Sequence, residues 1–180
     1  MKRIGLISDT HGLLRPEAVS FLAGCDHIIH AGDIGSTKIL GQLAAIAPIT
    51  AVRGNNDRDA WANEVPETAL LAFENDEHAA THVQRMPPRR AHRSEPAKPS
   101  TVVRIYTIHD IAQLDIDPVE SGVHVVVSGH SHKPGVREHD GVLYVNPGSA
   151  GPRRFKLPVA VAELSIAGNA MRPRIVTLTV

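Results

Sequence analysis

Short apolar runs alternate with polar clusters along this chain, and Gly, Asn, Asp or His follows most of the runs within a few residues. Runs rich in Ile, Val and Leu with such boundaries are typical of strands in a buried sheet. They predict strands over residues 4–7, 27–30, 49–52, 67–73, 102–108, 123–127, 136–138, 142–145, 159–165 and 171–180. Apolar positions at helical spacing, with Pro16 at one start and Ser36 as N-cap at the other, predict helices over 16–22 and 37–45. The pattern therefore predicts an α/β fold.

Two pairs of neighbouring strands in the C-terminal part are predicted to be hairpins. Asp140-Gly141 separates the runs at 136–138 and 142–145, and this dipeptide favours a type I′ turn. Gly168-Asn169 separates the last two runs in the same way. The second half of the chain is therefore expected to be richer in hairpins than the first.

Residues 74–100 differ in character from the rest of the chain. Apolar residues are sparse, and four prolines interrupt a mixture of arginines, glutamates and histidines. Such a segment cannot bury enough surface to offset its ordering entropy, so we predict a mobile insertion without secondary structure. Its histidines, His78, His82 and His92, are expected to be solvated rather than to bind metal. We find no internal repeat and predict a single domain over residues 1–180.

Composition excludes several classes of protein. The chain has 180 residues, 42% of them apolar and 21% charged, which is typical of one soluble globular domain. Lys+Arg and Asp+Glu balance at 19 each, so no net charge favours a nucleic-acid polymer or a membrane as partner. The single Cys25 and the short apolar start, which ends at Asp9, favour a cytoplasmic location. The oligomeric state stays open, with a homo-oligomer among the alternatives.

The candidate chemistry lies in polar residues that directly follow the predicted strands. These are Asp9, His11, Asp33, Asn55, His109, His130 and His132. Because the carboxyl ends of parallel strands share one edge of a sheet, we expect these side chains to converge there. Oxygen and imidazole donors without thiolate suit Mn²⁺, Fe, Zn²⁺, Co²⁺ or Ni²⁺ better than Ca²⁺. Seven donors suit two ions about 3.5–4 Å apart, a pair that lowers the pKa of bound water and clamps a phosphoryl group.

The order of these motifs resembles the calcineurin-like metallophosphoesterases, and in particular their small single-domain bacterial and archaeal phosphodiesterases. The motifs are D-x-H at Asp9, G-D at Asp33, G-N-x-D at Asn55, a histidine at the end of a strand, G-H-S-H at His130 and N-P-G-S at residues 146–149. The resemblance implies a four-layer α/β/β/α sandwich of two mixed sheets flanked by helices. It also implies a metal-dependent phosphodiesterase that acts on a small phosphodiester.

The resemblance further implies how two metal ions, with Mn²⁺ expected first, would be held. Asp9, His11 and His132 would hold one ion, Asn55, His109 and His130 would hold the other, and Asp33 would bridge them. Arg53 and Arg153 are candidates for contacts with the substrate phosphate, although each is also compatible with an exposed loop arginine.

The chain departs from the family pattern at two positions. Asn56 occupies the place of a histidine that protonates the leaving group, and an amide cannot transfer a proton near neutral pH. Asp57 or a metal-bound water is an alternative proton source. His109 lacks the flanking glycines that are frequent in the family, and its neighbour Asp110 could orient an imidazole or cap a helix.

Two other classes of function compete with this interpretation. A protein-interaction scaffold is one of them, because a retromer subunit uses a similar fold for binding rather than catalysis. A metallo-β-lactamase-type hydrolase is the other, but its H-x-H-x-D-H run is absent. The complete set of metal-ligand candidates favours the phosphodiesterase.

Overall fold

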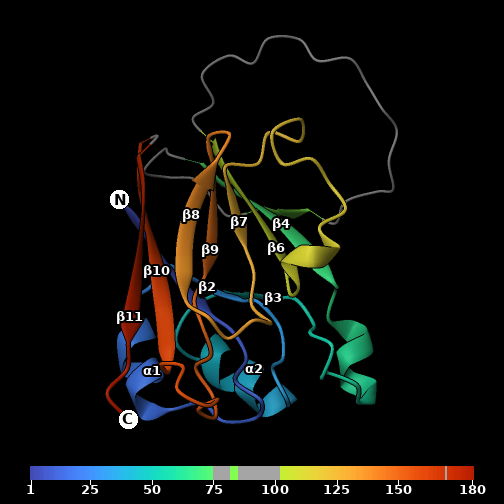
Figure 1. The fold of residues 1–180 in the computed structure, drawn as a ribbon, viewed down its shortest axis with the longest axis vertical. Coiled ribbons are helices and arrows are strands. Elements are labelled where there is room, and N and C mark those ends of the chain that lie inside the picture. The colour runs from blue at the N-terminus through green and yellow to red at the C-terminus, as the bar shows by residue number, and fades with distance from the viewer. Residues whose placement is uncertain (75–81, 85–101, 169) are drawn as a thin grey trace.

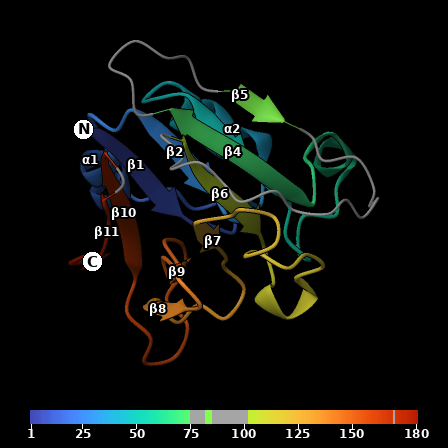
Figure 2. The same ribbon diagram turned by 90° about the horizontal axis from the view of Figure 1, so that it is seen from above.

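The computed structural model describes residues 1–74, 82–84, 102–168 and 170–180, which form two mixed sheets. The first sheet has five strands in the order β11-β10-β1-β2-β3. Its strands are β1 (Lys2–Ile7), β2 (His27–His30), β3 (Ile49–Ala51), β10 (Ala160–Ala167) and β11 (Ala170–Thr177). The second sheet has six strands in the order β5-β4-β6-β7-β9-β8 (Figure 1, and Figure 2 for β5). Its strands are β4 (Thr68–Glu74), β5 (His82–Gln84), β6 (Val102–Ile108), β7 (Val125–Val127), β8 (Gly135–His139) and β9 (Val142–Asn146).

The main hydrophobic core lies between the two sheets. Ile4 and Leu6 of β1 pack in one cluster with Leu71 of β4 and Ile105 of β6, and all four are fully buried. The β-branched and aliphatic runs seen in the sequence are therefore the inner faces of facing sheets, where apolar burial contributes most to folding.

The outer faces of the two sheets are covered differently. Helices α1 (Pro16–Leu22) and α2 (Thr37–Ala44) pack their apolar sides on the five-stranded sheet. Figure 2 shows α2 on the opposite side of the molecule from β8 and β9. The outer face of the six-stranded sheet packs against the single turn η2 (Ile111–Gln113) and the loop after it. A further 3₁₀ helix, η1 (Ala60–Glu64), precedes β4. The fold is thus the expected α/β/β/α sandwich, with its fourth layer reduced to η2.

Both predicted hairpins are present. Asp140 and Gly141 have φ values of 50° and 76°, which is the backbone of a type I′ turn, and they join β8 to β9. Strands β10 and β11 pair antiparallel on either side of Gly168.

One prediction about the 74–100 insertion is wrong. Residues 82–84 form the short strand β5, which pairs antiparallel with β4 through Leu70 and Gln84. A three-residue edge strand takes its order from the ladder of its neighbour, so its own sequence carries little signal. Glu74, the first residue of the predicted insertion, is the last residue of β4. The rest of the predicted insertion, including His78 and His92, lies outside the described residues. None of the helices in the described part of the chain is long and apolar enough to span a membrane.

His27 is a buried histidine that lies away from the chemistry-bearing loops. Its Nε2 lies 3.0 Å from Thr50 Oγ1, and its ring packs edge-on against Phe73 with 5.6 Å between centroids. Burial lowers the pKa of His27 to about 4, because the charged form would lose hydration inside the fold.

This lowered pKa predicts an acid-sensitive contribution to stability. An unfolded histidine has a pKa of about 6.5, so between this value and pH 4 the unfolded chain binds a proton that the folded chain does not. The contribution is therefore complete above pH 6.5 and is lost as the pH falls toward 4. His27→Gln should flatten the fall in unfolding free energy by up to about 1.4 kcal/mol per pH unit. Urea unfolding of both proteins at several pH values measures the slopes, and identical slopes would contradict the prediction.

Candidate metal centre

The loops after β1 and β2 are held together by backbone hydrogen bonds. Asp9 N donates to Gly32 O, and His11 N donates to Asp33 O, each at 2.9 Å. Since β1 and β2 are parallel, their ends lie side by side and these bonds extend the sheet into the loops. The pairing brings Asp9, His11 and Asp33 to one edge, as the sequence predicts.

His30 connects the same two loops through hydrogen bonds of its buried ring. Its Nε2 lies 2.9 Å from Thr10 Oγ1, and its Nδ1 accepts a bond from Gly32 N at 3.2 Å. The Thr10 hydroxyl donates onward to Ile34 O, so the Nε2 of His30 must carry the proton. Burial lowers the pKa of His30 to about 3, which keeps the ring neutral. His30 is thus hydrogen-bonded within the fold, and it positions the loops.

The backbone is strained at most of the expected ligand positions. Among the described residues, seven non-glycine positions have positive φ, and five of them are expected ligands. These five are Asp9 (54°), His11 (45°), Asp33 (55°), His130 (64°) and His132 (57°). Residues other than glycine rarely adopt positive φ, and backbone strain of this kind is concentrated at functional sites. The loops therefore aim these side chains inward at a conformational cost.

Asp9, His11 and His132 form the first group of donors. One ligand atom from each lies within 4.8 Å of the others, and His132 Nε2 lies 3.3 Å from Asp9 Oδ1. Asp9 Oδ1, His11 Nε2 and His132 Nδ1 are buried and have no hydrogen-bond partner. Buried polar atoms without partners are costly, and a cation among these three residues would satisfy Asp9 Oδ1 and His11 Nε2. The donor set therefore fits a metal ion.

His109 belongs to a second group, with Asp9 and Asp33. Its Nδ1 lies 2.8 Å from Ala31 O, and because a carbonyl only accepts, Nδ1 carries the proton and donates. This leaves Nε2 available, which is the usual arrangement of a metal-binding histidine. Nε2 lies 3.5 Å from Asp33 Oδ1 and 3.2 Å from Asn55 Oδ1.

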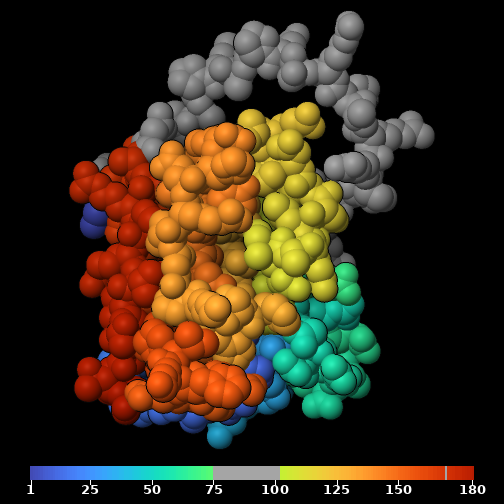
Figure 3. Space-filling model, viewed as in Figure 1, coloured from blue at the N-terminus to red at the C-terminus, as the bar shows by residue number. Residues whose placement is uncertain are grey.

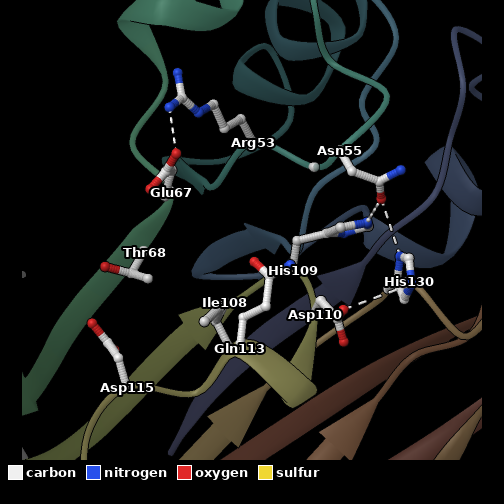
Figure 4. A pocket seen from close by; sticks show the side chains of 11 residues that line it. Arg53, Asn55, Glu67, Thr68, Ile108, His109, Asp110, Gln113, Asp115 and His130 are labelled. Carbon is white, nitrogen blue, oxygen red and sulfur yellow. Dashed lines mark hydrogen bonds and ion pairs between the residues drawn. The ribbon is translucent and has the colours of Figure 1, made fainter.

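Asn55 and His130 complete this side of the site. The Asn55 Oδ1 lies between the rings of His109 and His130, 3.1 Å from His130 Nδ1 (Figure 4). Asp110 accepts a bond from Ala112 N and also lies 3.8 Å from His130 Nε2, so it both caps η2 and faces an imidazole. The missing glycines beside His109 therefore do not displace it.

Asp33 lies between the two groups of donors. Its Oδ2 is 3.7 Å from His11 Nε2, and its Oδ1 faces His109. Asn56 holds this carboxylate, because Asn56 N donates to Oδ1 at 2.9 Å and Asn56 Nδ2 donates to Oδ2 at 2.6 Å. Burial alone would raise the pKa of Asp33, but the facing His109 ring and the hydrogen bonds from Asn56 outweigh burial and lower it. Sequence reasoning missed this role of Asn56.

Burial acts in the opposite sense on Asp9. It raises the pKa of Asp9 to about 6, while bonds from Ser8 and from the His130 backbone oppose the shift. The two carboxylates therefore differ in environment, although both are almost completely buried.

Asp57, which the sequence offers as a proton source, has a different role. Its carboxylate accepts bonds from the backbone N–H groups of Ile34, Gly35 and Gly54 at 2.8–3.0 Å. Asp57 thus ties the loop after β3 to the loop after β2, and the geometry gives no support to proton donation.

Two hollows meet at the candidate ligands. The first has a volume of about 240 Å³ and is the one drawn in Figure 4. Its lining includes Arg53, Asn55, Glu67, Thr68, His109, Asp110, Gln113, Asp115 and His130. The second has a volume of about 260 Å³ and is lined by Asp33, Asn56, His130, Ser131, His132, Arg154, Phe155 and Leu157. His130 lines both hollows.

The structure separates the arginines considered from the sequence. Arg53 lines the first hollow, where it forms an ion pair with Glu67. Arg153 donates to Val180 O at 3.5 Å and lines neither hollow, whereas its neighbour Arg154 lines the second. Sequence alone could not choose between two consecutive arginines in a loop.

Burial lowers the pKa of His132 to about 4, and the charges of His11 and Arg154 add to the shift.

Comparison with known proteins agrees with the geometry. A model of the calcineurin-like phosphoesterase superfamily domain matches residues 1–169. A protein of Methanothermobacter thermautotrophicus described as a probable metallophosphoesterase is 33% identical over 178 residues, which cover 96% of this chain and 91% of that protein. The chain therefore belongs to the calcineurin-like phosphoesterase superfamily, as its motifs predict. Membership supports its assignment as a metal-dependent phosphoric ester hydrolase.

Solved structures share the fold. A structure described as a novel archaeal phosphodiesterase superposes with a TM-score of 0.64 at 22% identity, over 97% of this chain and 99% of that one. Vps29 of Chaetomium thermophilum superposes with a TM-score of 0.68 at 15% identity, over 99% and 97% of the two chains. At these identities the likeness shows the architecture only.

Gly54 gives a test of how tightly the site is packed. A Cβ added at this position would lie 2.1 Å from Asp33 Oδ1 and 2.3 Å from Asp33 N. Gly54→Ala should therefore displace Asp33 and weaken metal binding by about tenfold or more, the usual effect of disturbing the residues around metal ligands. Calorimetric titration of the metal-free protein with Mn²⁺ measures the affinity for the metal.

Gly41 offers a matched control for this variant. It lies in α2, and an added Cβ would meet no atom within 4 Å. Gly41→Ala should leave the affinity unchanged and raise stability by about 1 kcal/mol, since Ala favours a helix more than Gly. Wild-type affinity in a folded Gly54→Ala protein would show that this packing does not position Asp33.

Proposed function

We propose that this protein is a dinuclear metal-dependent phosphodiesterase acting on small phosphodiesters. The observation that carries the proposal is the pair of hollows that meet at His130 and open beside one set of candidate ligands. A phosphodiester has two ester groups on one phosphorus, and each group would occupy one hollow. A monoester would need only one of them.

The donor sets support two ions. Asp9, His11 and His132 would hold one ion, Asn55, His109 and His130 would hold the other, and Asp33 would lie between them. The mixture of oxygen and imidazole donors suits Mn²⁺, and also Fe, Zn²⁺, Co²⁺ or Ni²⁺. When bound, such a pair supplies a nucleophile from water and neutralises charge on the phosphoryl group.

The chain's own residues orient the substrate around this centre. Arg154 would bind the phosphate from the second hollow, because a guanidinium forms strong charge-assisted bonds with phosphate oxygens. Asn56 holds Asp33 and cannot donate a proton to the leaving group. The site therefore favours esters whose leaving group departs without a positioned acid, such as aryl diesters and strained 2′,3′-cyclic nucleotides.

The charges around the first hollow favour a small substrate. Glu67, Asp110 and Asp115 line it together with Arg53, so carboxylates outnumber the arginine. A polyanion would meet repulsion there, which supports a small phosphodiester over a nucleic-acid polymer. We also propose a cytoplasmic location, which the single cysteine Cys25 supports because it cannot form a disulfide within the chain.

Elemental analysis and a substrate screen test the proposal together. We expect about two transition metal ions per chain after saturation, and a higher kcat/KM for bis(p-nitrophenyl) phosphate than for p-nitrophenyl phosphate. Less than one ion per saturated chain would overturn the dinuclear site. Full loading without hydrolysis of either ester would favour the competing scaffold function.

The two consecutive arginines provide a matched pair of variants. Arg154→Gln should lower kcat/KM for the diester about tenfold or more, because it removes a charge-assisted contact with phosphate. Arg153→Gln should leave kcat/KM within about twofold, since Arg153 lines neither hollow. Steady-state kinetics with bis(p-nitrophenyl) phosphate compares them, and equal losses in both variants would contradict the assignment.

A further inference from the structure

We propose that Phe155 determines substrate specificity by stacking on a planar aromatic ester group of the substrate. The inference rests on the proposed phosphodiesterase function and narrows its substrate class to diesters that carry an aryl or nucleobase-like ring. Three observations carry it: the exposure of Phe155, its backbone conformation and its place in the second hollow.

Phe155 is 95% exposed, whereas Phe73 is 2% exposed in the core between the sheets. Single apolar residues on a surface are common, so exposure alone carries no argument. Exposure does establish that the ring of Phe155 is available to a ligand. The segment that carries it, coloured orange-red, forms part of the surface at the lower end of the molecule in Figure 3.

The backbone of Phe155 has a φ of 52°. Of the seven described non-glycine residues with positive φ, five are candidate metal ligands and Asp140 belongs to a type I′ turn. Phe155 is the remaining one, and it lies in a turn closed by the hydrogen bond from Leu157 N to Arg154 O at 3.0 Å. The turn accounts for the φ value, but it would suit Gly or Asn better than an aromatic residue. Asn and Asp tolerate this conformation, but for a bulky aromatic residue it is an outlier. A ring that is almost fully exposed gains little from packing against the protein, so packing does not account for the strained backbone. Backbone strain that packing does not explain suggests a functional role.

The second hollow places the ring beside the reaction centre. Phe155 lines it together with Arg154 and the half-buried Leu157 of the same loop, and with the ligand candidates His130 and His132. A phosphate near the ligands and Arg154 would direct its ester group toward Phe155. The hollow thus combines a site for an anion with an apolar surface for the attached group.

An aromatic ring is the ester group that suits this surface. Phe155 offers one flat face in an open hollow, and stacking on a flat face gains both buried area and favourable ring electrostatics. An aliphatic group would bury less area on an open face. The positive charge of Arg154 in the same hollow disfavours a cationic group.

Binding of two simple phosphates tests the inference. Phenyl phosphate and methyl phosphate share the anion and differ in the ring, and the Phe155 variants report whether the ring occupies the second hollow. Calorimetry should show that the Mn²⁺-loaded wild type prefers phenyl phosphate. Phe155→Asn should weaken phenyl phosphate about fivefold or more and leave methyl phosphate unchanged, as expected for loss of one stacking interaction.

The variants are chosen to keep the fold. Asn tolerates positive φ, so Phe155→Asn removes the ring without adding strain. Phe155→Gly is the alternative if the Asn variant does not fold, and Phe155→Tyr should retain the preference because it retains the ring. Val119, 54% exposed and outside both hollows, provides the control variant Val119→Asn, which should bind both phosphates as the wild type does.

Failure of this inference is distinguishable from failure of the proposed function. A wild type without a preference for phenyl phosphate, or a Phe155→Asn protein that loses both ligands equally, would overturn the stacking role even if diesters are hydrolysed. Conversely, a ring-dependent preference in a metal-loaded protein that hydrolyses no ester would support Phe155 as a binding residue and refute the enzyme.

Discussion

Two buried carboxylates, Asp9 and Asp33, impose the constraint around which the structure is organised, since they are 0% and 2% exposed. A buried charge is costly unless it is hydrogen-bonded or paired. Asn56 donates hydrogen bonds to both oxygens of Asp33, while Asp9 Oδ1 has no hydrogen-bond partner. The surrounding histidines supply the other donors that a cation would need. Burial of charge thus connects the fold to the chemistry proposed for it.

The strands and the loops contribute to this site in different ways. Parallel pairing of β1 with β2 and of β6 with β7 brings the strand ends to one edge. The loops then turn through left-handed backbone to aim side chains inward, as at His130 and His132. Buried braces such as His30 hold the turns in place. The core between the sheets provides the rigid support that lets such strain persist.

Membership of the superfamily and the architecture shared with Vps29 and with an archaeal phosphodiesterase define the scaffold, but not the substrate. Functions differ among proteins of one fold because they reside in the site. In this chain the features that bear on substrate are the two hollows, the arginine at position 154 and the exposed ring of Phe155. Arg154 and Phe155 both lie outside the ligand motifs.

The sequence by itself determined the strand order along the chain, the I′ turn at Asp140 and the set of polar residues at strand ends, because periodicity and turn chemistry are local. Only the tertiary structure decided which atoms meet. It showed that Asn56 holds Asp33, that Asp57 ties loops together, and that Arg154 rather than Arg153 lines a hollow. Strand β5 also depends on its neighbour. These outcomes depend on contacts between segments distant in sequence, and local patterns do not encode such contacts.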